Sequence, residues 1–172
     1  ANICAKFYEL TLDCVAVAEF VAAKSRSEPG QSALFVGGMF GVASQLSGSG
    51  LLLTAVDYTD EMVEIGKLSL PDSQVLKADL RSLPFESEFD LVFVVGRVFT
   101  HMTSEKDLTD AVLSCRRSLK PGGRIFVDNY ESSKIQVTNY FNGEVRCADS
   151  SAEILRRSKT TLISSDPFIV QW

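Results

Sequence analysis

The segment Ser32–Gly41, SALFVGGMFG, constrains the fold of this chain more than any other. Its apolar residues Ala33–Val36 predict a buried strand, and a tight turn follows at three glycines: Gly37, Gly38 and Gly41. Asp57 comes twenty residues after the first of these glycines, at the end of a second apolar run, Leu51–Val56. This order predicts a nucleoside site, because glycines let the backbone approach a ligand and the acid accepts hydrogen bonds from ribose hydroxyls.

The same turn carries two large side chains, Met39 and Phe40, where a loop of this kind usually has small residues. A side chain at either position could fill the space that close backbone approach requires, unless it points into the core or the loop takes a different course. The segment therefore predicts a nucleoside site together with two side chains that could obstruct it.

Strands and helices are expected to alternate along most of the chain. The first 25 residues have a helical apolar pattern, and further helices are expected at Val42–Leu46, from Thr59 or Asp60 to Leu70, and from Thr103 or Ser104 to Leu119. The last helix would bury Leu108, Val112, Cys115 and Leu119. Strands are expected at Ala33–Val36, Leu51–Val56, Gln74–Ala78, Phe89–Val95 and, after a turn at Lys120–Gly123, from Arg124. This alternation predicts an α/β fold with a Rossmann-like, doubly wound parallel sheet.

The pattern changes after Tyr130, where short strands with turns such as Asn142-Gly143 predict an antiparallel meander. The expected strands are Ile135–Phe141, Val145–Cys147, Ile154–Ile163 and Phe168–Trp172. We expect a domain over residues 1–130 and an extension over 131–172 that packs on the same domain or on a partner. The apolar run Phe168–Trp172 predicts association with a second copy or a different subunit, unless the tail folds back on its own sheet.

Composition excludes several classes of protein. The 172 residues, 45% apolar and 23% charged, are typical of a soluble domain with a real core. A net charge of −5 without a basic stripe argues against nucleic acid as a partner, and a small-molecule substrate is expected. No apolar run is long enough for a membrane span, and no leader pattern opens the chain, so we expect a cytoplasmic protein. Its four cysteines lack a C-x-x-C pair, so reduced thiols are expected and a metal site is not.

Four segments in order resemble the class I S-adenosylmethionine-dependent methyltransferases. They are Ala33–Gly41, Ala55–Val63, Lys77–Phe85, and Phe89–Val92 with Leu119–Gly123. The resemblance covers about Ser32–Tyr130, and extends more loosely to the small-molecule branch, such as the sugar N-methyltransferases. Lys6-Phe7-Tyr8 resembles that branch's N-terminal lid helix. The chain departs from the family at Phe35, where an acid is usual, and at Met39, where glycine is usual.

The resemblance implies S-adenosylmethionine as cofactor. Asp57 would hold the ribose, Asp79 would accept a hydrogen bond from the adenine amino group, and Leu80 would pack on the ring. The implied cofactor-binding set is Gly37, Gly38, Gly41, Asp57, Tyr58, Asp79 and Leu80. The strand ends independently predict one crevice, because ligands of open α/β sheets bind beyond the carboxyl ends of the strands.

Three residues are candidates for the chemistry. His101, the single histidine, could take a proton from an amine or hydroxyl nucleophile, or could simply open the following helix. Arg97 could bind an anionic substrate group, or could pair with an acid of the crevice. Asp128 could orient a substrate amine.

The first function expected is N- or O-methylation of a small molecule. The second is an enzyme of the same fold that no longer uses the cofactor and aligns a substrate for cyclisation or elimination. The third is a non-catalytic methyltransferase-like subunit. A nicotinamide-dependent dehydrogenase is a weaker fourth, because the chain has no G-x-G-x-x-G motif.

Overall fold

The computed structural model describes residues 2–131, 142–159, 161–165 and 168–171. Its internal contacts divide it into two units, Ala1–Asn129 and Tyr130–Trp172, and each is described here by itself.

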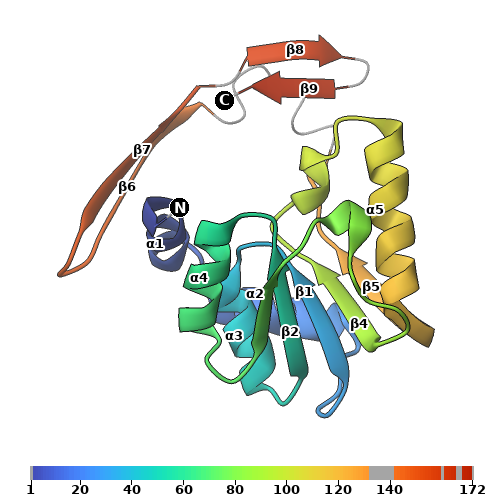
Figure 1. Cartoon of the computed structure of the whole chain (residues 1–172). Coiled ribbons are helices and arrows are strands. Elements are labelled where there is room, and N and C mark those ends of the chain that lie inside the picture. The colour runs from blue at the N-terminus through green and yellow to red at the C-terminus, as the bar shows by residue number, and fades with distance from the viewer. Residues whose placement is uncertain (1, 132–141, 160, 166–167, 172) are drawn as a thin grey trace. The chain divides into compact units, whose positions relative to one another are not determined.

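The first unit is built on a five-stranded parallel sheet with the strand order β3-β2-β1-β4-β5 (Figure 1). The strands are β1 (Ser32–Val36), β2 (Leu52–Asp57), β3 (Gln74–Lys77), β4 (Phe89–Val94) and β5 (Leu119–Val127). The predicted α/β class with a doubly wound parallel sheet is confirmed. Because the order reverses between β1 and β4, this fold places a ligand crevice at that point of the sheet.

Among its described residues, this unit also has five α-helices and two short 3₁₀ helices, of which the first two α-helices precede β1. They are α1 (Asn2–Thr11), α2 (Cys14–Ser25), α3 (Phe40–Gly48), α4 (Asp60–Ser69), η1 (Leu80–Ser82), η2 (Val98–His101) and α5 (Glu105–Ser118). The helical stretch expected over the first 25 residues is broken before α2, because Asp13 caps that helix by accepting a hydrogen bond from Ala16 N. Thr59 caps α4 and Ser104 caps α5 in the same way.

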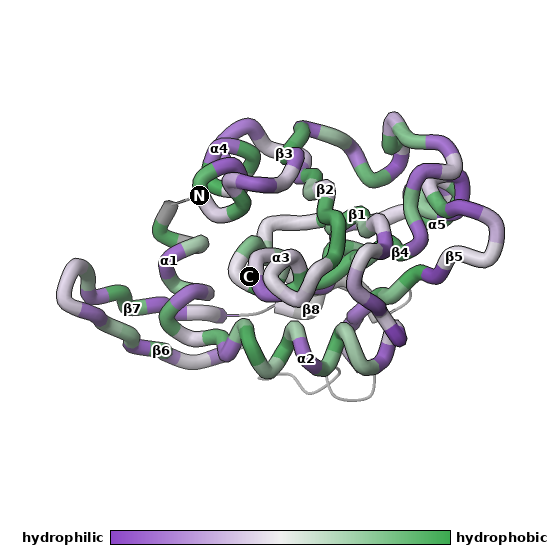
Figure 2. The backbone as a smooth tube through the Cα atoms, turned by 90° about the horizontal axis from the view of Figure 1, so that it is seen from below, coloured by the Kyte–Doolittle hydropathy of each residue, from purple (hydrophilic) through white to green (hydrophobic). Residues whose placement is uncertain are grey.

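The core lies on both faces of the sheet. Alternate residues of β1 point to opposite sides, so Phe35 packs with residues of α2, α3 and α4, whereas Leu34 packs with residues of α5 and η1. Strands β1, β2 and β4 are accordingly rich in hydrophobic residues (Figure 2). A nearly continuous apolar run is what a parallel strand covered on both faces requires.

The buried face of α5 differs from the predicted one. Leu108 and Val112 are 45% and 48% exposed, and the helix instead buries Ala111, Ser114, Cys115 and Ser118. Of the predicted face only Cys115 is fully buried. The small side chains allow the helix to lie close to the sheet.

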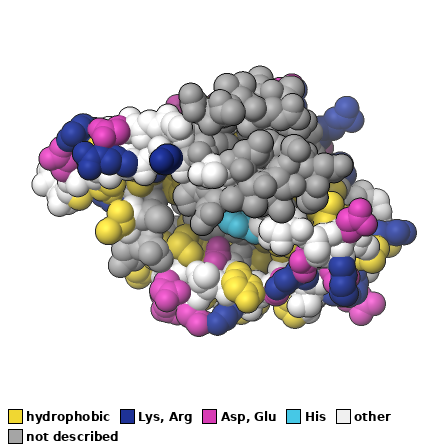
Figure 3. Space-filling model, turned by 90° about the horizontal axis from the view of Figure 1, so that it is seen from above, with side chains coloured by type: hydrophobic (Ala, Val, Ile, Leu, Met, Phe, Trp, Pro, Cys, Tyr) yellow, Lys and Arg dark blue, Asp and Glu magenta, His cyan; other side chains and the backbone are white. Residues whose placement is uncertain are grey.

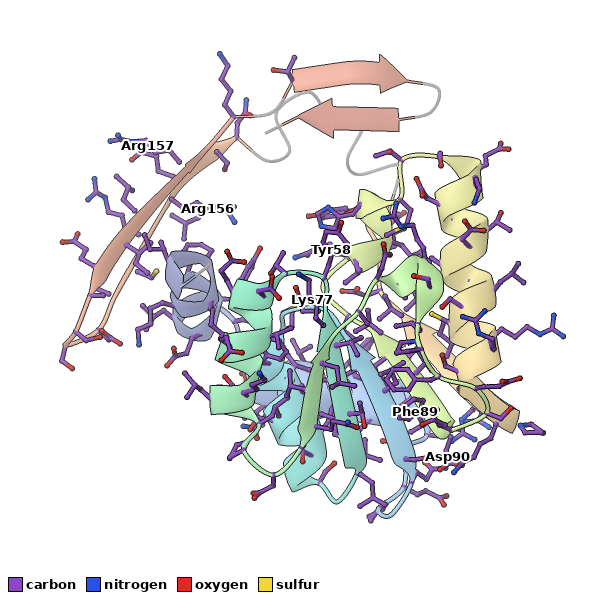
Figure 4. All side chains as sticks on the ribbon, viewed as in Figure 1. Tyr58, Lys77, Phe89, Asp90, Arg156 and Arg157 are labelled. Carbon is purple, nitrogen blue, oxygen red and sulfur yellow. The ribbon has the colours of Figure 1, made fainter. Side chains whose placement is uncertain are left out.

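Strand β5 also begins earlier than predicted, at Leu119 rather than Arg124. Phe89 pairs with Leu119 and Leu91 pairs with Arg124, so the predicted turn Lys120–Gly123 is an irregularity within the strand. Lys120 Nζ donates a hydrogen bond to Asp90 Oδ2 at 3.0 Å, which connects this irregularity to β4. Figure 4 labels Asp90 on that strand.

The second unit contains two antiparallel pairs among its described residues. Strand β6 (Gly143–Ala148) pairs with β7 (Glu153–Ser158), and β8 (Thr161–Ser165) pairs with β9 (Phe168–Gln171). The predicted single strand Ile154–Ile163 is therefore two strands, and the predicted meander is two separate sheets. The expected strand Ile135–Phe141 and the residue Trp172 lie outside the described residues. In the part of the chain that the structure describes, no helix is both long and apolar enough to cross a membrane.

Candidate functional site

A cavity of about 600 Å³ lies at the carboxyl ends of the strands of the first unit. Its lining comes from α1, from the loops after β1, β2, β3 and β4, and from η1 and η2. Eight of the predicted site residues line it: Gly37, Gly38, Asp57, Tyr58, Asp79, Leu80, Arg97 and His101. The remaining two, Gly41 and Asp128, do not.

The glycine turn after β1 forms one wall of the cavity. Gly37 has φ +107°, and a Cβ built on it would lie 2.7 Å from Val98 Cγ2 and 3.2 Å from the carbonyl oxygen of Val95. A Cβ on Gly38 would contact the Met62 methyl group and lie 3.5 Å from Asp57 Oδ2. The absence of side chains therefore keeps backbone exposed next to the acid of β2. Gly41 has a different role, because a Cβ there would lie 2.7 Å from Cys14 Sγ, at the packing of α3 on α2.

The two large side chains of this turn point to different places. Phe40 is 3% exposed and packs in the core, where its ring would meet a Cβ on Gly66 at 2.7 Å. Phe40 does not line this cavity but a different one, of about 410 Å³, between α1, α3 and α4. Met39 lines both cavities, and its Sδ would lie 2.8 Å from a Cβ on Gly96. Phe40 therefore points into the core, one of the alternatives that the sequence left open, whereas Met39 forms part of the wall of the first cavity.

Asp57, the last residue of β2, presents one carboxylate oxygen to the cavity side. Its Oδ1 accepts hydrogen bonds from the amide (3.0 Å) and hydroxyl (3.2 Å) of Thr59. Its Oδ2 faces Gly38, the neighbouring part of the lining. Tyr58 follows with a side chain that lines the cavity, and the residue is 64% exposed (Figure 4). One oxygen is therefore held by the start of α4, while the other faces the space available to a ligand.

Asp79 is held by an arginine that the sequence analysis did not single out. Arg81 donates to Asp79 Oδ1 from its amide (2.9 Å) and Nε (3.0 Å), and to Oδ2 from Nη2 (2.6 Å). These hydrogen bonds lower the pKa of Asp79 below its usual range. Arg81 also lines the cavity, and its Nη1 donates to Asp107 Oδ1 at 2.9 Å. The sequence did contain a signal for this pair, because Arg81 comes two residues after Asp79. At that spacing a short helical turn brings the two side chains together.

The loop after β4 brings the remaining candidates to the cavity. Asp128 Oδ1 accepts hydrogen bonds from the amides of Gly96 (2.9 Å) and Arg97 (2.7 Å). These bonds hold two residues with positive φ, +99° and +61°. His101 ends η2 and is exposed, and the single histidine is visible at the surface in cyan in Figure 3. Asp128 therefore holds the backbone of the loop without lining the cavity, while Arg97 and His101 line the cavity.

Metal ligation has no candidate in the ranges that the structure describes, because no group of three or more His, Cys, Asp or Glu residues is arranged to hold an ion there.

Comparison with solved structures identifies the fold. The sugar N-methyltransferase KedS8 from Streptoalloteichus sp. superposes with a TM-score of 0.77 at 21% identity, over 92% of this chain and 65% of that one. DesVI from Streptomyces venezuelae superposes with a TM-score of 0.78 at 18% identity, over 93% of this chain and 69% of that one.

Comparison of sequences identifies the family. Demethylmenaquinone methyltransferase of Renibacterium salmoninarum is 30% identical over 104 residues, which are 59% of this chain and 42% of that protein. The chain spans about two fifths of the length of the curated relatives it matches. The family model described as a methyltransferase domain matches residues 36–127, which is more than half of the chain and runs from the last residue of β1 to the end of β5. The chain therefore belongs to the methyltransferase domain family, the class I S-adenosylmethionine-dependent family that its sequence resembles.

Proposed function

We propose that this chain carries the cofactor-binding domain of an enzyme that methylates a small molecule at nitrogen or oxygen, with S-adenosylmethionine as the methyl donor. The observation that carries the proposal is the single cavity that brings together the turn at Gly37 and Gly38, the carboxylate of Asp57 and the carboxylate of Asp79. When bound, the cofactor supplies a methyl group already activated by its sulfonium.

The residues of the cavity fit this cofactor group by group. The bare backbone of Gly37 and Gly38 admits close approach, as a bulky ligand chain requires. Asp57 Oδ2 would accept from a ribose hydroxyl, and Asp79 from an exocyclic amine. Tyr58 and Leu80 supply apolar surface for the base between these acids.

The methyl acceptor would be bound on the side of η2. His101 would take the proton that the nucleophile loses, and Arg97 would bind an anionic group of the acceptor. Asp128, predicted as a catalytic residue, is proposed instead to position the loop, because it holds the amides of Gly96 and Arg97 and does not line the cavity. Because methyl transfer needs mainly alignment of nucleophile and methyl group, this set of residues is sufficient.

The names of two structural neighbours make a sugar amine one acceptor to test. KedS8 is named a sugar N-methyltransferase and CalS10 an amino pentose methyltransferase. Their low sequence identity supports the fold alone, so nitrogen and oxygen acceptors both remain within the proposal.

One observation favours the second candidate, an enzyme of this fold that works without the cofactor. Met39 lines the cavity beside Gly96, at a position where glycine is usual in the family. The same binding experiment separates the two candidates.

The experiment is calorimetric titration of the full chain with S-adenosylmethionine and S-adenosylhomocysteine. Asp57→Ala removes the acceptor for the ribose and should weaken binding roughly tenfold or more, the effect of losing a charge-assisted hydrogen bond. Asp72→Ala, which removes an exposed carboxylate in the loop after α4, is the matched control and should bind as the wild type does. Absence of binding by the wild type would reject the cofactor in favour of the second candidate. Equal binding by the wild type and Asp57→Ala would reject the role proposed for Asp57.

Two further proposals concern the assembly of the protein and its location in the cell. An assembly through the C-terminal strands, with a second copy or another subunit, rests on the apolar run Phe168–Trp172. A cytoplasmic location rests on free thiols at Cys14, Cys115 and Cys147, which suit a reducing compartment.

A further inference from the structure

Arg81 contacts two acidic residues at the candidate site, Asp79 and Asp107. Its side chain donates to both oxygens of Asp79, and its other terminal nitrogen donates to Asp107. Asp107 is in turn held by the hydroxyl of Ser104, which donates to Asp107 Oδ2 at 2.8 Å. The arginine thus connects the loop after β3 to the N-terminus of α5.

The donors of Arg81 nearly fill the acceptor positions of Asp79. Its amide N–H, its Nε–H and one Nη2–H point at the carboxylate, and the Nε–H is shared between Oδ1 at 3.0 Å and Oδ2 at 3.1 Å. An ionised carboxylate offers about four lone-pair positions, so about one remains for a ligand. The side chain of Asp79 is 26% exposed, and the residue lines the cavity.

We propose that Arg81 is a positioning residue that fixes Asp79 as a pure acceptor with one open position, and thereby makes the cavity select a base with an exocyclic amino group. This inference rests on the proposed function and deepens it. A carboxylate held by three donors does not turn, and while ionised it has no hydrogen to donate. An amino group at that position finds an acceptor, whereas a carbonyl oxygen meets a second acceptor and loses its hydrogen bond to water without replacement.

The second anchor explains why the residue is arginine. The planar guanidinium reaches Asp79 through Nε and Nη2 and Asp107 through Nη1, which are different edges of one group. Lysine keeps the charge but carries a single ammonium group. It could not orient the carboxylate of Asp79 and bind Asp107 of α5 at the same time. Specificity for the base should therefore depend on the shape of the guanidinium as well as on its charge.

The test compares two ligands that differ at this position of the base. S-adenosylhomocysteine carries the amino group, and S-inosylhomocysteine carries a carbonyl in its place. Calorimetry of the full chain gives the ratio of the two dissociation constants for the wild type, Arg81→Lys and Asp107→Asn. Arg116→Lys is the matched control, because this exposed arginine on α5 does not line the cavity. The melting temperature of each variant without ligand checks that it is folded.

Arg81→Lys should lower the preference for S-adenosylhomocysteine roughly tenfold, the effect of one charge-assisted hydrogen bond. Asp107→Asn should lower it in the same direction by less, and it serves as the second variant if Arg81→Lys does not fold. Arg116→Lys should keep the wild-type ratio.

Unchanged ratios in Arg81→Lys and Asp107→Asn, with a wild type that binds S-adenosylhomocysteine, would overturn this inference and leave the proposed function standing. A wild type that binds neither ligand would overturn the proposed function and this inference with it. An equal fall of both affinities, with the ratio unchanged, would reduce Arg81 to a structural role.

Discussion

At the scale of single residues, the two adjacent glycines of the turn after β1 meet different neighbours. A Cβ on Gly37 would lie close to the backbone carbonyl of Val95, which cannot move alone, and the φ of +107° is unfavourable for alanine. A Cβ on Gly38 would meet the terminal methyl of Met62, the mobile end of a flexible side chain.

We therefore expect Gly37→Ala to lower the free energy of unfolding by about 1–3 kcal/mol, the usual cost of a residue in an unfavourable backbone conformation. Gly38→Ala should change the free energy of unfolding much less. It should lower the affinity for S-adenosylhomocysteine, because the new methyl group lies in the cavity wall beside Asp57. Chemical denaturation and calorimetry of the two variants measure both effects. Equal destabilisation by the two substitutions, or unchanged affinity in Gly38→Ala, would contradict this interpretation of the turn.

Most of the site residues predicted from the sequence line the cavity, but not every side-chain direction could be predicted. The alternation of strands placed Asp57 and Asp79 at one edge of the sheet, and both line the cavity. The direction of Phe40 could not be predicted, since it depends on the space left by Gly66 on another helix. Gly41 and Asp128 do not line the cavity, because Gly41 lies where α3 packs on α2 and Asp128 accepts hydrogen bonds from the amides of Gly96 and Arg97. Both contacts involve residues distant in the sequence, so local patterns do not contain them.

At the scale of elements, the amino ends of three strands are joined by one cluster. Asp90 of β4 accepts hydrogen bonds from the amide (2.8 Å) and hydroxyl (2.7 Å) of Ser32 on β1, and from Lys120 (3.0 Å) on β5. The bonds from Ser32, and then that from Lys120, lower the pKa of the Asp90 carboxyl to about 2. The cluster lies at the end of the sheet opposite the cavity and so concerns stability alone.

This pKa predicts a pH dependence of stability with a definite sign. A carboxyl whose pKa is lower in the folded state stabilises the fold above its unfolded pKa of about 3.9 and loses that contribution as the pH falls toward the folded pKa. Asp90→Asn should therefore be less stable than the wild type at neutral pH, and its unfolding free energy should fall less steeply between about pH 4 and pH 2. Urea unfolding across this range measures both slopes. Asp72→Asn should follow the wild type, and a parallel decline of wild type and Asp90→Asn would refute the assignment.

Sequence predicted the existence of the elements better than their packed faces. Helix α5 was expected to bury Leu108 and Val112, but it buries Ser114 and Ser118 instead. Apolar periodicity finds the stripe with the largest side chains, whereas this helix uses small ones, and the Ser114 hydroxyl accepts a hydrogen bond from the amide of Leu83 at 2.7 Å. Such a buried polar contact depends on a loop distant in the sequence, so a local pattern does not contain it.

At the scale of the whole molecule, the doubly wound parallel sheet followed from physical rules, whereas the division of the tail did not. Right-handed crossovers and glycine turns restrict a chain of alternating strands and helices to few sheet orders. No such rule restricts the pairing of the strands after Tyr130. The single strand expected over Ile154–Ile163 is two strands in separate sheets. A short apolar run predicts a strand but does not name its partner.

The position of the cavity within the chain leads to a prediction about the two units. Among the described residues, every one that lines it lies between Ala5 and Met102, and Asp128, which supports its loop, also belongs to the first unit. That unit has 129 residues and a core on both faces of its sheet, which is enough for independent folding. A chain ending at Asn129 should therefore unfold cooperatively and bind S-adenosylhomocysteine with the dissociation constant of the full chain.

Circular dichroism during thermal unfolding and calorimetry of the truncated chain measure the two parts of this prediction. The truncated chain carrying Asp57→Ala is the control, and should lose affinity as it does in the full chain. A truncated chain that is folded but binds weakly would show that residues after Asn129 contribute to the site. A truncated chain that does not fold would show that the two units are not independent, because the first would then need the second to complete its core.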